Sequence, residues 1–169
     1  GLADKLANER GGTRRARAGQ EVRVVDLPAD AGAGLGLFEV LHGATDGGAF
    51  AQRLATAARR LYGTAGRTFL ERLVEAGEEA VTAAQEARRQ FLASHTPEGA
   101  SGQVRRVADR FALLAAAGEA AIALGVLPFA PGEAERAAAR GFTDWLSARE
   151  GGAGHAEDAA AIAAVRREP

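Results

Sequence analysis

The sequence predicts a mainly α-helical protein, a bundle of about five helices with one short β-strand region near the N-terminus. After Asp46, apolar residues recur at three- and four-residue spacing, and clusters of glycine, proline and serine separate the periodic stretches. The clearest strand signal is the β-branched run over residues 21–27, which closes at Pro28. With 169 residues, the chain is long enough for an ordinary domain with its own core.

The chain ahead of the long helices contains only short predicted elements. Residues 2–9 have a brief helical pattern, and two glycines then end it. A basic segment over 13–20 leads into the strand and is too rich in charge to pack by itself. Residues 29–36 form a Gly/Ala loop. Because no Gly-Lys-Ser/Thr follows this loop, we do not expect it to bind phosphate.

Several helices are predicted after this loop. The first runs from an N-cap at Asp46 to Gly63, and the second opens at Thr64 or Thr68, bends at Gly77 and extends to residue 92. Further helices are predicted over residues 102–126, 133–149 and 155–167. The side chains expected to face inward are Phe69, Leu70, Leu73 and Val74 in the second helix, and Ala137, Phe142, Trp145 and Leu146 in the fourth.

The helix over 102–126 is predicted to be the centre of the fold. Its apolar residues recur at helical spacing and are expected to form one buried stripe: Val104, Val107, Phe111, Leu114, Gly118 and Ile122. Its first turns carry Arg105, Arg106, Asp109 and Arg110. The favoured interpretation is a central bundle helix with solvated arginines. The alternative is that one of these arginines reaches an anion such as a phosphate.

Glu119 is the only charged residue between Phe111 and Phe129. We expect its side chain to point outward between alanines, and the alternative is that it has a partner within the fold. The stretch 111–129 is near membrane-spanning length, but its Ala and Gly content and its glutamate favour a buried helix. No membrane partner is therefore expected.

The composition excludes several kinds of site. The chain has no cysteine, which excludes disulfides, thiol catalysis and Cys-ligated zinc, and which suits the cytoplasm, where we expect the protein to reside. His42, His95 and His155 lie far apart, so no metal site is expected. The net charge of −1 means that any basic function must be local. Methionine is absent even at position 1, which indicates a start inside a longer reading frame or a removed start.

The basic segment is the best local candidate for a binding site. Arg14, Arg15, Arg17 and Arg23 lie within ten residues, next to glycines and just before the strand. The planar guanidinium matches phosphate oxygens, so such a loop can contact a nucleic-acid backbone or place an arginine finger against a nucleotide. The alternative is a solvated arm without a ligand.

Several stretches of the sequence resemble one family, the uncharacterised-domain family of phage, plasmid and integrated elements usually described as superfamily II helicase-like or primase–helicase proteins. The most specific part is the Arg-Ala-Gly-Gln-Glu-Val-Arg block over 17–23. The remaining stretches that carry the resemblance are residues 2–6, 15–32, 36–39, 41–43, 62–66, 69–70, 103–119, 145–146 and 151–158.

The resemblance implies that this chain is the C-terminal portion of a nucleic-acid-dependent ATPase. Residues 1–36 would be the end of a RecA-like core with its edge strand, 37–150 a helical C-terminal domain, and 151–169 a linker and the start of a further helix. The parent would use ATP and Mg²⁺, act on single-stranded or forked DNA and form a ring-shaped homo-oligomer. This portion lacks Walker motifs. No cofactor is therefore expected in it, and it is not expected to be catalytic alone.

The resemblance also implies roles for the arginines. Arg15, Arg17 and Arg23 are arginine-finger candidates, and Arg14, Arg15 and Arg17 are candidates for contacts with nucleic acid. The nucleotide-sensing candidates are Arg105, Arg106 and Arg110. The first functional hypothesis is therefore DNA or subunit-interface contacts within a mobile-element helicase. The second is a non-catalytic helical domain for protein–protein assembly, and an exposed apolar stripe on the helix that opens at Thr64 would favour it.

Overall fold

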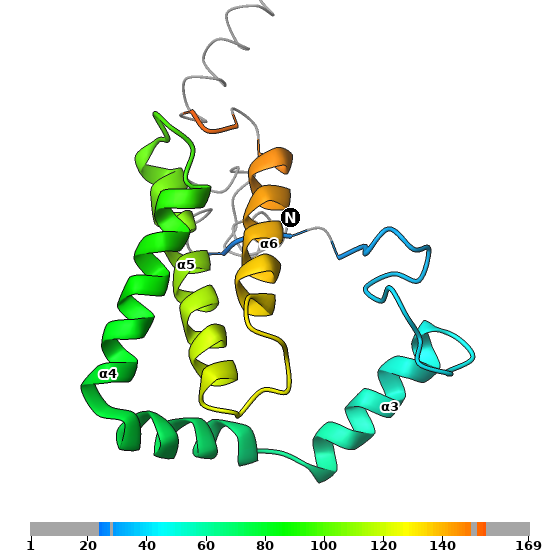
Figure 1. Ribbon diagram of the computed structural model, residues 1–169. Coiled ribbons are helices and arrows are strands. Elements are labelled where there is room, and N and C mark those ends of the chain that lie inside the picture. Colours follow the sequence, from blue (N-terminus) through cyan, green and yellow to red (C-terminus); the bar gives the residue numbers. More distant parts are fainter. Residues whose placement is uncertain (1–23, 28, 150–151, 155–169) are drawn as a thin grey trace, which may run out of the picture. The chain divides into compact units, whose positions relative to one another are not determined.

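The computed structural model describes residues 24–27, 29–149 and 152–154. Within these ranges it contains four helices and no strand: α3 (Gly47–Arg60), α4 (Thr64–His95), α5 (Gly102–Ala123) and α6 (Glu133–Ala148) (Figure 1). The prediction of a mainly helical protein is confirmed. Residues 24–27, the described part of the predicted strand, are irregular, so that strand is not confirmed. The helices predicted over 2–9 and 155–167 lie outside the described residues.

The chain divides into two compact units, and the division falls within α4. Unit 1 comprises the described residues of Gly1–Leu27 and Ala76–Pro169, and unit 2 is Pro28–Glu75. Gly77 has φ 58° and ψ −137°, which is not a helical conformation. Only glycine adopts such a conformation without strain, so the predicted bend is confirmed and has a local cause.

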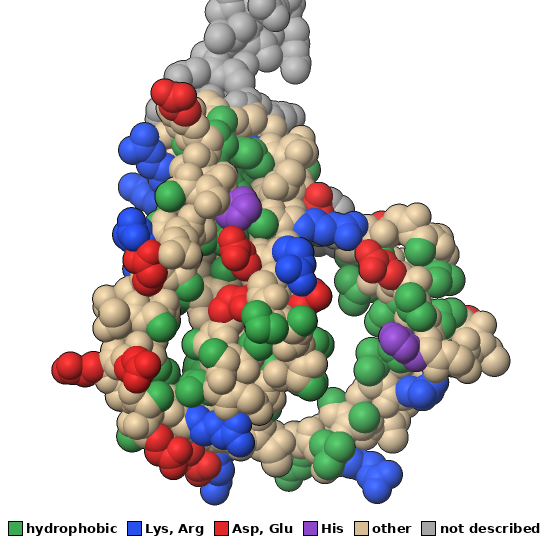
Figure 2. Space-filling view, viewed as in Figure 1, with side chains coloured by type: hydrophobic (Ala, Val, Ile, Leu, Met, Phe, Trp, Pro, Cys, Tyr) green, Lys and Arg blue, Asp and Glu red, His purple; other side chains and the backbone are tan. Residues whose placement is uncertain are grey.

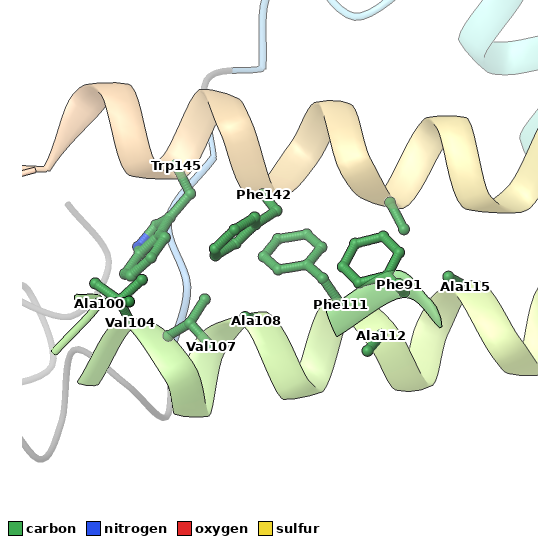
Figure 3. Close-up of a cluster of buried hydrophobic side chains, with 11 residues drawn as sticks. Phe91, Ala100, Val104, Val107, Ala108, Phe111, Ala112, Ala115, Phe142 and Trp145 are labelled. Atoms are coloured by element: carbon green, nitrogen blue, oxygen red, sulfur yellow. The ribbon is translucent and has the colours of Figure 1, made fainter. Parts of the chain in front are cut away.

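The core of unit 1 lies between α5 and α6, which run side by side, with the C-terminal part of α4 against them (Figure 1). Aromatic rings fill its centre (Figure 3). The ring of Phe142 lies 5.8 Å from that of Phe111 and 5.9 Å from that of Trp145, and Phe91 enters from α4 with 1 % of its surface exposed. The smaller buried side chains are Ala100, Val104, Val107, Ala108, Ala112, Ala115 and Ala138.

Two glycines allow α5 and α6 to approach closely. A Cβ atom on Gly118 would overlap the Cβ of Ala134, and one on Gly141 would lie 2.9 Å from Cε1 of Phe111. Both separations are well inside van der Waals contact, so a side chain at either position must displace the neighbouring helix or ring. The predicted inward position of Gly118 is therefore confirmed, and its role is to be small.

The buried face of α5 differs from the predicted stripe at Leu114. Val104, Val107, Phe111 and Ile122 are buried as expected, but Leu114 is 63 % exposed and Ala115 takes the buried position after Phe111. The helical repeat lies between three and four residues, so the next buried residue after Phe111 can be either Leu114 or Ala115. The close helix contact favours alanine, which needs less room.

The same one-residue shift occurs in α6. Ala137, predicted to face inward, is exposed, and Ala138 is buried in its place. Phe142 and Trp145 are buried as predicted, and Leu146 packs partly against the core.

The N-cap predicted for α3 at Asp46 is confirmed, whereas α3 ends at Arg60, before the predicted Gly63, and the N-cap of α5 was not predicted. Oδ1 of Asp46 accepts a hydrogen bond of 2.8 Å from the amide of Ala49 at the start of α3, and Ser101 caps α5 through the amide of Val104. Helix α5 ends at Ala123, earlier than predicted. Gly125 follows with φ 66°, and the amide of Val126 donates back to the carbonyl of Ala121, as in a Schellman motif.

Unit 2 has no fully buried side chain among its described residues. Within it Phe38 and Phe50 form an edge-to-face pair, whose ring centroids are 4.8 Å apart. Leu70 and Val74 were predicted to face inward, but they are 61 % and 79 % exposed, so that prediction is wrong for both. The other two side chains predicted to face inward there, Phe69 and Leu73, are half-buried.

Candidate interaction surface

The side of α5 opposite the core combines positive charge with large apolar side chains. At helical spacing it presents a row of exposed residues, which we call the outer face of α5: Arg106, Arg110, Leu113, Leu114 and Ala117. Leu113 is 60 % exposed and Leu114 63 %. These residues recur at intervals of four, three, one and three positions, which places them on one side of the helix.

The predicted nucleotide-sensing arginines lie on α5 near its N-terminus. Arg105, Arg106 and Arg110 are all exposed. Positive side chains also gather over the upper part of α4 and α5 at one edge of the view in Figure 2. The structure therefore places these three arginines on a solvent-facing surface.

Asp109 is partly neutralised by a partner on α4. Arg88 binds its carboxylate in a bidentate manner, with Nη2 2.6 Å from Oδ1 and 2.7 Å from Oδ2, and Nε 3.0 Å from Oδ1. Because both side chains are nearly half exposed, the pair contributes at most about 1 kcal/mol to stability. Its main consequence is that the acid between Arg106 and Arg110 is already paired.

The basic segment predicted to contact DNA lies outside the described residues. This applies to Arg14, Arg15, Arg17 and Arg23, so their contacts with nucleic acid and the arginine-finger role of the last three stay predictions.

Glu119 joins α5 to the start of α6, a role that the sequence analysis did not favour. Its Oε2 accepts a hydrogen bond of 2.8 Å from the amide of Gly132, and its Oε1 one of 3.1 Å from the amide of Glu135. Gly132 has no side chain to cap α6, so Glu119 satisfies free amides at that helix N-terminus from a neighbouring helix. The expectation that Glu119 points outward without a partner is wrong.

The surroundings of Glu119 favour its ionised form. Desolvation by burial raises the pKa of its carboxyl. Hydrogen bonds from the amides of Gly132, Glu135 and Ala134, together with the charge of Arg136, outweigh that effect and hold the pKa below its usual value. The carboxylate also faces the positive end of the α6 dipole.

Replacing Glu119 with glutamine is expected to lower the free energy of unfolding at neutral pH by about 1 kcal/mol, the usual cost of weakening a helix cap. Because the folded-state pKa of Glu119 is depressed, its ionised form stabilises the fold above the unfolded-state pKa of about 4.3. This contribution is lost as the pH falls through the folded-state pKa. Urea unfolding at a series of pH values should show the two proteins converging in acid.

The matched control for this experiment is Glu98→Gln. Glu98 is exposed in the turn between α4 and α5, so its substitution should change stability by no more than about 0.5 kcal/mol. A difference between wild type and Glu119→Gln that stays constant down to pH 3 would contradict the assigned role of the carboxylate charge.

Arg149 fastens the chain after α6 to the beginning of α5. Its Nη1 donates to the carbonyls of Gly152 (2.6 Å) and Gly154 (2.8 Å), and its Nη2 donates to Oε1 of Gln103 (2.6 Å). Its guanidinium also lies 5.8 Å from the ring centroid of Trp145. The pattern of a helix ending in arginine before glycines gave no sign of this long-range contact.

The two described histidines take part in packing. The ring of His95 lies 4.5 Å from that of Phe91, and its Nε2 is 3.5 Å from Oε1 of Glu135. His42 lies against Phe50, with ring centroids 5.5 Å apart. In the part of the chain that the structure describes, no group of three His, Asp or Glu side chains could hold a metal ion.

Comparisons with known proteins give no relative for this chain. No protein-family model, no curated protein and no solved structure matches it. The resemblance to helicase-like proteins of mobile elements therefore stays a prediction. None of the described helices combines the length and the apolar character needed to cross a membrane.

Proposed function

We propose that this chain is a non-catalytic helical domain for protein–protein assembly, with the outer face of α5 as a partner-binding surface. The observation that supports this proposal is the exposure of Leu113 and Leu114, at 60 % and 63 %, on the helix whose opposite side forms the core. Single exposed leucines are common on protein surfaces, whereas adjacent ones in a row with exposed arginines are typical of an interaction site.

The chemistry of the outer face indicates the kind of partner. Covering a leucine side chain completely contributes roughly 1.5–3 kcal/mol, so burying the exposed parts of Leu113 and Leu114 can supply useful binding free energy. Arg106 is exposed on the same face and would meet a carboxylate of the partner. The partner is expected to present an apolar segment flanked by acidic residues.

Site-specific photocrosslinking tests this proposal. A photoreactive residue at position 114 is expected to give a discrete protein adduct in cells, whereas one at the exposed position 93 of α4 is not. The partner is then purified and its affinity measured. Leu113→Ser/Leu114→Ser should weaken binding at least about tenfold, since 1.4 kcal/mol is a factor of ten.

Leu37→Ser is the matched control, because Leu37 is 69 % exposed but belongs to unit 2. Its affinity for the purified partner should equal that of the wild type. The proposal fails if position 114 gives no discrete adduct, or if the double serine variant binds the purified partner as tightly as the wild type does.

We infer a second candidate function from the exposed arginines of α5, which is a contact with the phosphates of DNA. It would make this chain the C-terminal helical portion of a mobile-element helicase or primase-associated ATPase, with the ATP site and Mg²⁺ in a RecA-like core elsewhere in the parent. The exposure of Arg105 and Arg106 near Arg110 favours it, since guanidinium groups bind phosphate well. In that parent, residues 21–27 would be an edge strand of the core.

Fluorescence anisotropy with single-stranded DNA across a salt series tests this second function. Binding that falls steeply with salt and weakens in Arg105→Ala/Arg106→Ala would support a phosphate contact on α5. Loss of binding in Arg15→Ala/Arg17→Ala alone would assign the contact to the basic segment. No binding at low salt would remove this function from the chain, and none of these three results affects the leucine experiment.

A further inference from the structure

Helix α3 in unit 2 has an apolar stripe beside a wholly basic set of charges. Phe50 and Leu54 are one turn apart, and the stripe continues to Leu61 at the C-cap. The helix contains Arg53, Arg59 and Arg60 and no acidic residue. Leu54 is 49 % exposed and Leu61 77 %, so most of this apolar surface faces water.

Such a helix has little to hold it in place within unit 2. Isolated helices shorter than about 12–15 residues are marginal in water, and α3 has 14 residues, none of them buried. Phe50 is partly covered, by Phe38 and His42, whereas residues 51–60 are all exposed. Packing against an apolar surface is what usually makes a helix of this length stable, so α3 is expected to have a partner.

Helix α4 carries the complementary surface. Leu70 and Val74 are one turn apart and exposed at 61 % and 79 %. Glu71 and Glu75 lie next to this pair at the same one-turn spacing. Within unit 2 these two glutamates give α4 carboxylates directly beside its exposed apolar pair, with Arg67 one turn earlier on the helix.

We propose that unit 2 binds a second copy of this chain, with α3 of each copy packed on α4 of the other. The contact is reciprocal, as in a two-fold symmetric dimer. Each copy therefore uses once its basic stripe, which is the exposed face of α3, and once its acidic stripe, which is Leu70, Glu71, Val74 and Glu75 of α4. Leu54 and Leu61 then cover Leu70 and Val74 of the partner copy, while arginines meet glutamates. This surface is separate from the outer face of α5, so the inference goes beyond the assembly function proposed above.

Other occupants fit the charges less well. Anionic lipid or a nucleic-acid backbone would attract the arginines of α3, but it would repel Glu71 and Glu75 and leave Leu70 and Val74 exposed. The two stripes do not cover each other within one chain, because both are exposed. A second copy satisfies both stripes together.

Charge reversal tests the proposal by sedimentation equilibrium over a concentration series. The wild-type chain is expected to dimerise. Arg53→Glu/Arg60→Glu and Glu71→Arg/Glu75→Arg should each weaken the dimer at least about tenfold, because like charges then face each other in both contacts. An equimolar mixture of the two variants should form a heterodimer, since each reversed helix then meets an opposite charge. Far-UV circular dichroism checks that both variants keep their helices, because Arg53 also donates to the carbonyl of His42.

Three outcomes would overturn the inference. These are a wild-type chain that stays monomeric over the whole concentration range, a mixture of variants that fails to recover the dimer, and binding of α3 to anionic vesicles that displaces the dimer. If the dimer survives charge reversal but is lost in Leu113→Ser/Leu114→Ser, the second copy binds the outer face of α5 instead. In that case the proposed assembly function stands while this inference fails.

Discussion

Replacing Phe142 with alanine is expected to lower the free energy of unfolding by about 3–5 kcal/mol, the usual range for removing a buried aromatic ring. Phe142 is 1 % exposed and touches the rings of both Phe111 and Trp145 (Figure 3). Its removal leaves a cavity at the centre of the contact between α5 and α6. Urea unfolding followed by circular dichroism at 222 nm measures the change.

Phe129→Ala is the matched control for this substitution. The same atoms are removed, but Phe129 is 59 % exposed in the turn between α5 and α6. Its loss should cost much less, no more than about 1 kcal/mol. Equal effects of the two substitutions would show that Phe142 is not at the centre of the core.

Gly118→Ala is expected to destabilise the protein by about 1–3 kcal/mol, although alanine is the better helix former. A Cβ atom at position 118 would overlap the Cβ of Ala134 in α6. Because the backbone fixes the position of a Cβ atom, side-chain rotation cannot relieve this overlap. The helices must separate, and the aromatic contacts beside them are then weakened. Thermal unfolding should show a lower Tm, by about 2–4 °C for each kcal/mol.

Gly66→Ala provides a control of opposite sign. Gly66 lies within α4, and a Cβ atom there would meet nothing within 4 Å. Its substitution should therefore stabilise α4 by about 0.5–1 kcal/mol through helix propensity. If both glycine variants were stabilised, the close approach of α5 and α6 at Gly118 would be wrong.

The helices, the N-cap of α3 and the bend in α4 could be predicted because their causes are local. The side chain of Asp46 caps the amide three residues later, and the backbone at Gly77 departs from helical angles, and both effects involve only neighbours in sequence. Apolar periodicity also located most of the α5 stripe. It failed at Leu114, because the choice between residues 114 and 115 depends on how much room the neighbouring helix leaves.

The candidate site was less predictable, since its features depend on tertiary contacts. Glu119 accepts hydrogen bonds from residues 13 and 16 positions away, and Arg149 reaches Gln103 across 46 positions. Nothing at Glu119 itself distinguishes a capping carboxylate from a solvated one. Gly132 at the N-cap of α6 was a usable signal, because glycine has no side chain to cap the helix. The free amides at that helix start then need a hydrogen-bond acceptor from elsewhere in the fold.

The sequence predicted burial for Leu114, since leucine at helical spacing usually indicates burial, whereas Leu113 was not part of the predicted stripe. Their exposure was found only once the position of α6 was known. The arginines of the same face were singled out from sequence, and the structure places them at the surface as the solvated interpretation requires.

The hairpin formed by α5 and α6 also has a consequence for folding kinetics. Its core contacts join helices that are consecutive in the chain and linked by one short turn, so little loop entropy is lost in forming them. Proteins dominated by such local contacts fold in microseconds to milliseconds. The contact between α5 and α6 is therefore expected to form early, so substitutions in the hairpin should slow folding more than those in α3 do.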